Sequence, residues 1–221
     1  MATERIRKTE RFLHDQFAAS AHLQQKPEER NYRIEHSYRV ANIARTIAKG
    51  EGMDEEALVI AALLHDISYC EPMETREAQL GHGRASARIS RPFLESIGLP
   101  EATIQEICYG IAIHVDDEAD FAGERTPFAL SVGDADNIDR FDAYRIYETL
   151  EWKRFSSLDL AQKRCEVSAT LERLKKYQEL PFATQTATDL WVERLSFYTA
   201  FYNRLSAQLS ASDGLFGGPD L

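Results

Sequence analysis

Ala61-Ala62-Leu63-Leu64-His65-Asp66 is the stretch that decides the fold of this chain. It closes an apolar run that begins at Ala57, and a helix formed by that run would be apolar on every side and therefore buried. An imidazole and a carboxylate follow at adjacent positions. Burying such groups without partners costs about 2–7 kcal/mol for a neutral polar group and more for a charge. A bound metal cation would compensate this cost, so the doublet predicts a metal site.

The composition is that of an ordinary soluble globular protein. The 221 residues, 43% hydrophobic and 28% charged, are enough to bury a full core. No apolar run approaches about 18 residues and the first residues lack an apolar signal core, so we expect a cytoplasmic protein with no membrane partner. The net charge of -10 argues against nucleic acid as a partner but leaves room for a small phosphorylated substrate. The three scattered cysteines indicate neither disulfides nor a thiolate zinc site.

Apolar residues recur at helical spacing on both sides of the central run, and no alternating strand pattern of useful length is present. Asp54 is expected to cap the central helix, and Pro92 to kink or split a later one. The other helical segments are expected at 3–24, 33–49, 82–97, 104–114 and 140–210. A further helix is expected past Pro127 and would hold Asp134, Asp136 and Asp139. The pattern therefore predicts an all-α fold.

Four of the six histidines lie on the apolar stripes of different expected helices: His36, His65, His82 and His114. One such histidine is more often a hydrogen-bonded core residue than a ligand, but four placed in this way indicate a shared site. Imidazole nitrogen and carboxylate oxygen suit hard or borderline divalent metals, and Asp66 and Asp136 would balance their charge. Ligands on packed helices are also held more firmly than ligands on loops.

These residues carry a family resemblance. In chain order, His36, His65-Asp66 and Asp136 resemble the H…HD…D signature of the HD-domain superfamily of metal-dependent phosphohydrolases. The flanking residues fit as well: Arg33-Ile34-Glu35-His36-Ser37 resembles R-x-x-H-S, the stretch from Ala61 to Asp66 resembles AALLHD, and Ala135-Asp136-Asn137-Ile138-Asp139 resembles ADxLD. The resemblance covers roughly residues 30–145 and implies an HD-domain-like helical bundle in which His36, His65, Asp66 and Asp136 bind a metal between helices. Asp136 fits the last motif better than Asp134.

The resemblance also implies a reaction and its cofactor. His82 and His114 resemble the extra histidines of members with a second metal, where Asp66 would bridge both ions; they could instead contact substrate or support a single ion. One or two ions of Mn, Fe, Mg, Zn or Co are implied, with hydrolysis of a phosphate ester or anhydride. A metal lowers the pKa of bound water from about 15.7 to ~7, which gives a hydroxide nucleophile at neutral pH. The expected catalytic residues are His65, Asp66, His82 and His114.

Three further residues are candidates for substrate binding. Arg33 lies one helical turn before His36, and its guanidinium could hold a non-reacting phosphate oxygen. Asp139 lies one turn after Asp136 and could orient a ligand or accept a substrate hydroxyl, and Arg140 follows it. The expected partner is a small phosphorylated molecule, with a nucleotide as the leading candidate. The second doublet, His14-Asp15, and His22 are expected to lie outside the site.

We expect one all-α domain over 1–221, with an HD-like catalytic core at 30–145, a C-terminal helical extension at 146–210 and a flexible tail at 211–221. An aromatic amphipathic helix within the extension permits a homodimer.

Alternatives to a nucleotide phosphohydrolase stay open. A cyclic-nucleotide or guanosine-polyphosphate hydrolase would use the same ligands, as would a di-iron oxygenase of HD type. A non-catalytic binding module would use the metal for stability alone, although the intact ligand motifs favour an enzyme. The sequence lacks the Gly-Tyr-Pro companion motif of the HD-GYP cyclic-dinucleotide phosphodiesterases.

Overall fold

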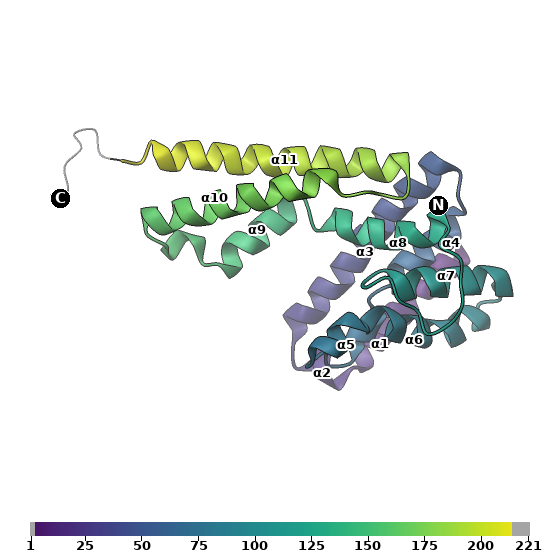
Figure 1. The fold of residues 1–221 in the computed structure, drawn as a ribbon. Coiled ribbons are helices and arrows are strands. Elements are labelled where there is room, and N and C mark those ends of the chain that lie inside the picture. The colour runs from purple at the N-terminus through teal and green to yellow at the C-terminus, as the bar shows by residue number, and fades with distance from the viewer. Residues whose placement is uncertain (1–2, 214–221) are drawn as a thin grey trace. The chain divides into compact units, whose positions relative to one another are not determined.

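The computed structural model describes residues 3–213, which form helices and connecting loops with no strand among them (Figure 1). The predicted all-α fold is therefore confirmed. Backbone contacts divide the chain into two compact units, of which unit 1 comprises Met1–Asp139 with Phe182–Thr188 and unit 2 comprises Arg140–Pro181 with Asp189–Leu221. Most of the predicted flexible tail, from residue 214 onward, lies outside the described residues.

Unit 1 holds the segment that resembles the HD family as far as Asp139. In chain order its elements are α1 (Glu4–Ala19), α2 (Ala21–Gln24), α3 (Pro27–Glu51), α4 (Glu55–Leu64), the 3-10 helix η1 (Ile67–Cys70), α5 (Arg76–Leu80), α6 (His82–Ser96), α7 (Glu101–Ile113) and α8 (Pro127–Asp139).

Helix α4 is the centre of unit 1. It packs against α1, α3, α6, α7 and α8, and every residue from Ala57 to Leu64 is buried. The Asp54 side chain accepts a hydrogen bond from the Ala57 backbone N–H at 3.0 Å, so the predicted N-cap is present. Because the helix is surrounded, its C-terminal end delivers the His-Asp doublet into the interior.

Several helix limits differ from those expected. The segment 3–24 forms two helices, because the extended backbone of Ser20 ends α1 and its hydroxyl caps α2 by accepting the Leu23 N–H at 3.1 Å. Helix α3 begins earlier, at Pro27, whose fixed φ suits the first helical position. Pro92 lies inside α6 without splitting it, so the helix tolerates the loss of the one backbone N–H that proline lacks.

Unit 2 contains α9 (Ala143–Trp152), η2 (Phe155–Ser157), α10 (Leu160–Lys176), η3 (Tyr177–Glu179) and most of α11 (Gln185–Ser210). Helices α10 and α11 lie side by side in opposite directions (Figure 1): Arg164 near the start of α10 donates to the Leu209 carbonyl at 2.7 Å, and Trp191 Nε1 donates to the Tyr177 carbonyl at 3.0 Å. Trp191 also packs edge-on against Phe141, with ring centroids 4.5 Å apart. These aromatic contacts form the core of unit 2.

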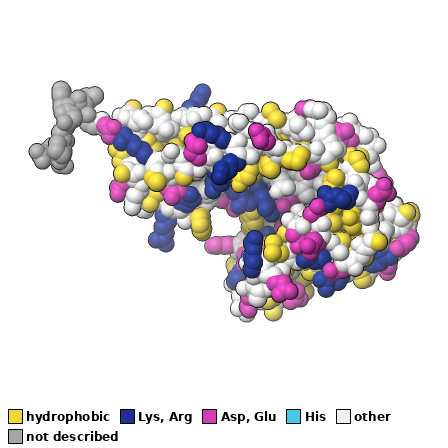
Figure 2. All heavy atoms as spheres, viewed as in Figure 1, with side chains coloured by type: hydrophobic (Ala, Val, Ile, Leu, Met, Phe, Trp, Pro, Cys, Tyr) yellow, Lys and Arg dark blue, Asp and Glu magenta, His cyan; other side chains and the backbone are white. Residues whose placement is uncertain are grey.

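The surface carries charge of both signs. On the face drawn in Figure 2, basic side chains are interspersed with acidic ones. Among residues 3–213, no helix combines the length and the apolar character needed to cross a membrane.

Candidate metal centre

The His-Asp doublet lies where α4 ends. His65 still has helical backbone angles (φ -55°, ψ -36°), whereas Asp66 has left the helix (φ -106°, ψ 13°) and begins η1. Both residues are buried, with 0% and 2% of their surface exposed. The change of backbone direction between them, inside a packed core, fixes where each side chain points.

Unit 1 brings six of the predicted site residues into one histidine–aspartate cluster. His36 comes from α3, His65 and Asp66 from the end of α4, His82 from the start of α6, His114 from the residue after α7, and Asp136 from α8. All six side chains are almost completely buried.

One half of the cluster is built around His36 and His65. Their Nε2 atoms lie 3.2 Å apart, and Asp136 Oδ1 lies 3.2 Å from the first and 3.8 Å from the second. Asp66 Oδ2 lies 3.7 Å from His36 Nε2. Two imidazole nitrogens and two carboxylates therefore face one small volume.

The other half is built around His82 and His114. Their Nε2 atoms lie 3.1 Å apart. Asp66 Oδ1 lies 3.0 Å from His82 Nε2 and 3.7 Å from His114 Nε2. The Asp66 carboxylate thus stands between two imidazole pairs and directs one oxygen toward His36 and the other toward His82 and His114.

Backbone carbonyls orient three of the four imidazoles. In each case Nδ1 contacts the carbonyl oxygen three residues earlier: His65 with Ala62 at 2.7 Å, His82 with Gln79 at 2.6 Å and His114 with Ile111 at 2.7 Å. A carbonyl only accepts, so we assign the Nδ1 proton to this bond and leave Nε2 as the atom that faces the cluster. This arrangement is typical of histidines that bind metal.

Asp139 orients the fourth imidazole. Its Oδ2 accepts a hydrogen bond from His36 Nδ1 at 2.8 Å, and its Oδ1 accepts one from Arg39 Nε at 2.9 Å. Of the two roles expected for Asp139, the geometry fits the orientation of a ligand. Sequence reasoning missed Arg39, which lies one turn after His36 and fixes the position of this carboxylate.

The charges in the cluster compensate one another. Burial lowers the pKa of His36, but hydrogen bonds with Asp136 and Asp139 outweigh burial and raise it to about 9. Burial dominates at His65 and lowers its pKa to about 4. Burial also disfavours the charged form of Asp66, yet the surrounding histidines and Arg33 hold the pKa of its carboxyl well below the ordinary value. The negative charge held on Asp66 therefore favours positive charge among the surrounding imidazoles.

The donor set fits divalent metal ions. Three sets of three residues could each hold an ion, because within each set the ligand atoms lie within 4.8 Å of one another. The sets are His36 with His65 and Asp66, His65 with His114 and Asp136, and Asp66 with His82 and His114. Imidazole nitrogen and carboxylate oxygen are the ligands that Zn, Mn and Fe use in proteins. Because Asp66 belongs to two of the sets, the cluster has the ligands for one ion or for two.

Arg33, a candidate for substrate binding, lies against the cluster. Its Nη1 is 3.0 Å from Asp66 Oδ2, and its guanidinium carbon lies 3.3 Å from the centre of the Tyr69 ring. The buried Nε has no hydrogen-bond partner among the described residues. An open pocket of about 360 Å³ begins at these two side chains and is called the Arg33 pocket below.

The remaining residues weighed in the sequence are not among the six that form the cluster. Arg140 is exposed and belongs to unit 2. His14 contacts the Tyr38 hydroxyl at 3.0 Å in an exposed position. Asp134 accepts the Ala183 backbone N–H at 2.8 Å, and burial raises its pKa to about 6. His22, expected outside the site, lines the Arg33 pocket. Nothing in the sequence indicated that the polar connector around His22 would face the loop after Tyr69.

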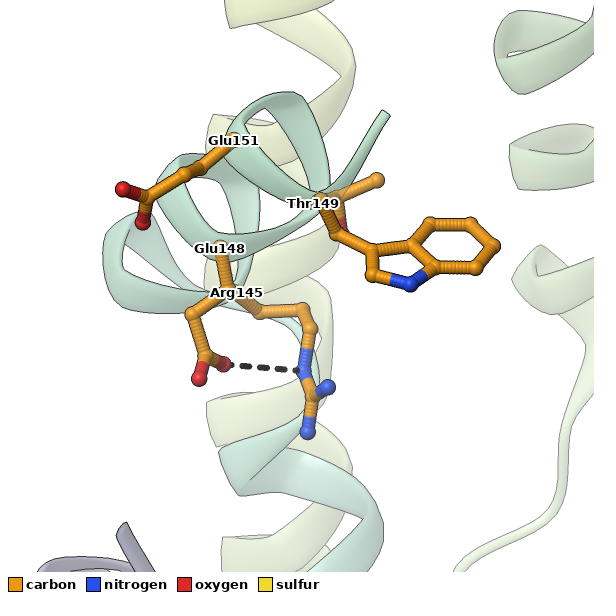
Figure 3. A pocket seen from close by; sticks show the side chains of 5 residues that line it. Arg145, Glu148, Thr149 and Glu151 are labelled. Carbon is orange, nitrogen blue, oxygen red and sulfur yellow. Dashed lines mark ion pairs between the residues drawn. The ribbon is translucent and has the colours of Figure 1, made fainter. Parts of the chain in front are cut away.

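A second hollow lies on unit 2 and is shallow. Its lining comes entirely from α9 and includes Arg145, Glu148 and Thr149, with Arg145 Nε 3.8 Å from Glu148 Oε2. Figure 3 shows this ion pair and shows Glu151 directed away from it. None of the predicted catalytic or metal-binding residues lines this hollow.

Comparisons with known proteins agree with this geometry. The sequence model of the HD domain matches residues 33–144, just over half of the chain. No curated protein matches. A solved structure of a predicted HD superfamily hydrolase from an uncultured Thermotogales bacterium is 22% identical over 91% of both chains, with a TM-score of 0.62. A solved structure of a protein from Lactobacillus plantarum is 19% identical over 96% of this chain and 100% of its own, with a TM-score of 0.57. The chain therefore belongs to the HD domain family.

Proposed function

We propose that this HD-domain protein is a metal-dependent hydrolase that acts on a small phosphorylated substrate. The observation that carries the proposal is the convergence of four imidazole Nε2 atoms and two carboxylates in one buried cluster. The Thermotogales neighbour, described as a predicted HD superfamily hydrolase, supports a hydrolase in general.

The residues divide into two sets that share one carboxylate. His36, His65, Asp66 and Asp136 would hold one ion, and Asp66, His82 and His114 would hold a second. Divalent ions bound there would supply Lewis-acid chemistry, which stabilises charge on a phosphoryl group and makes water a nucleophile at neutral pH.

The protein's own part is to fix these side chains and exclude bulk water. Asp139 holds the His36 ring, and backbone carbonyls hold the other three imidazoles. Arg33 orients Asp66 through a 3.0 Å contact, and its positively charged guanidinium lies at the edge of the cluster. A guanidinium in that position suits a non-reacting phosphate oxygen, because charge-assisted hydrogen bonds to phosphate are strong and directional. The reacting phosphate would lie beside Arg33 at the edge of the cluster.

We further propose that the substrate is a nucleotide. The Arg33 pocket is lined by the arginine that contacts Asp66, and its volume lies within the range of about 300–1,000 Å³ of small-molecule sites, so it has room for more than a phosphate. A cyclic nucleotide or a guanosine polyphosphate would use the same cluster, and a substrate panel separates them.

The test combines metal content with turnover. Protein purified without chelator is assayed for bound metal and then for phosphate release from a nucleotide panel with added Mn²⁺. We expect hydrolysis by the wild type, its loss in His65→Ala with helical circular dichroism retained, and wild-type turnover in the control His14→Ala, whose side chain contacts Tyr38 instead.

Three other outcomes would reject the proposal. Undiminished turnover in His65→Ala would show that the cluster is not the active site. Metal binding without turnover of any phosphorylated compound would indicate a binding module. Metal-dependent consumption of dioxygen in place of hydrolysis would indicate an oxygenase.

A further inference from the structure

The Arg33 pocket is linked to the cluster through Arg33, and the proposed reaction does not explain the space that it encloses. Its walls come from the segment between α2 and the first turns of α3 and from the segment that follows η1, all within unit 1. At its inner end Arg33 contacts both Asp66 and Tyr69. A substrate whose phosphate lies at Arg33 would therefore extend into this pocket with the group on the far side of the scissile bond.

The pocket has no excess of positive charge. Its cations are Lys26 and Arg33, and its carboxylates are Glu29 and Glu74. Lys26 Nζ lies 3.4 Å from Glu29 Oε2, and Arg33 is already assigned to the reacting phosphate, so neither is left for a further one. A chain of further phosphates would need several unengaged cations, and two carboxylates would repel it. The charge balance therefore disfavours a polyphosphate in this space.

The lining suits an uncharged group that donates hydrogen bonds. Glu74 carries a carboxylate, which only accepts hydrogen bonds, and Glu29 carries a second one, which Lys26 already contacts. Met73 and the Tyr69 ring add apolar surface between these polar groups. Hydroxyl and amino donors on a flat, partly apolar body match this combination, and a nucleoside has both.

We propose that the Arg33 pocket binds the nucleoside portion of a nucleoside monophosphate and so selects monophosphates over polyphosphates. The placement of the phosphate rests on the proposed function. The preference for an uncharged nucleoside rests only on the charges and the other lining residues of the pocket. It can therefore be tested by binding alone, without turnover.

Binding of nucleosides without phosphate tests the pocket directly. Adenosine, guanosine, cytidine and thymidine are titrated into the full-length protein and followed by saturation-transfer NMR. We expect at least one to bind the wild type and to lose about tenfold in affinity in Glu74→Lys, the size of effect expected when about 1.4 kcal/mol of binding energy is lost. Glu77→Lys is the matched control, because Glu77 is exposed on α5 and is not part of the pocket lining. It should bind as the wild type does.

The outcomes separate this inference from the proposed function. Failure of all four nucleosides to bind, or equal affinities in Glu74→Lys and the wild type, would overturn the inference whatever the enzyme hydrolyses. If the wild type turns over nucleotides, Glu74→Lys should raise KM for monophosphates more than it lowers kcat, because the side chain meets the leaving group and not the reacting atoms. Preferred hydrolysis of triphosphates by the wild type would also contradict the inference while leaving the proposed function intact.

Discussion

Asp139 Oδ2 lies 2.8 Å from Nδ1 of His36, on the side of the imidazole that faces away from the cluster. Asp136, one helical turn earlier in α8, lies 3.2 Å from Nε2 of the same ring. One helix thus presents one carboxylate to the expected metal position and a second that fixes the ligand. We predict that Asp139→Asn keeps the fold and weakens Mn²⁺ binding about 10–100-fold, as is typical when such a partner is lost. Equilibrium dialysis measures the affinity.

Asp134→Asn is the matched control for this prediction. Asp134 lies in the same helix, but its carboxylate accepts the backbone N–H of Ala183 instead of a histidine. The Mn²⁺ affinity of this variant should stay close to that of the wild type. If Asp139→Asn bound Mn²⁺ as tightly as the wild type, the assignment of Asp139 as the residue that orients His36 would be wrong.

The position of Asp66 between two imidazole pairs predicts two ions per chain. Its Oδ1 lies 3.0 Å from His82 Nε2, and its Oδ2 lies 3.7 Å from His36 Nε2. Removing the His114 ring in His114→Ala should lower the stoichiometry from two ions to one, because the His36 side keeps all its ligands. Metal analysis after gel filtration measures this ratio. One ion per chain in both the wild type and His114→Ala would instead indicate that His82 and His114 bind substrate or support the single ion.

Much of the fold and of the cluster could be predicted because the cluster residues are polar groups on helix faces that are otherwise apolar and buried. The run from Ala57 to Leu64 is apolar on all sides, so only a central helix accommodates it. His36 is buried on an otherwise apolar stripe, and such a polar group requires a partner. His36 was therefore visible in the sequence as an exception to the apolar pattern around it.

The buried face of α6 shows why pattern alone was incomplete. The apolar residues Ile89 and Phe93 are one helical turn apart and yet are only partly buried, whereas Ser86 and Ser90 are fully buried. Ser90 Oγ donates to the Ser86 carbonyl at 2.7 Å, and Ser86 Oγ donates to Ser68 Oγ at 2.9 Å. These bonds satisfy hydroxyls that a polarity pattern assigns to the surface. The Arg33 pocket could not be predicted either, because its walls come from segments that are distant in sequence and meet only through tertiary packing.

Thiol chemistry reports on burial in the two units independently. Cys108 in α7 is buried, and burial raises its pKa to about 11, whereas Cys165 in α10 is exposed. At pH 8 the Cys108 thiolate, the reactive form, is scarce as well as shielded. We predict that a disulfide reagent labels Cys165 rapidly and Cys108 only on unfolding, and that Cys165→Ser removes the fast phase. Rapid labelling of Cys108 in the native protein would show that α7 is not packed as described.

Gly83 allows α6 to approach the end of α7 closely enough for His82 and His114 to meet. A Cβ at this position would lie 2.6 Å from the Ala112 carbonyl oxygen and 2.8 Å from that of Ile111, so the backbone would have to move. We predict that Gly83→Ala costs about 1–3 kcal/mol of stability, as is usual for overpacking, and weakens the second metal position more than the first. Gly81→Ala, with its nearest contact at 3.3 Å, should cost less. Thermal unfolding with and without Mn²⁺ measures both effects, and equal behaviour of the two variants would contradict this role for Gly83.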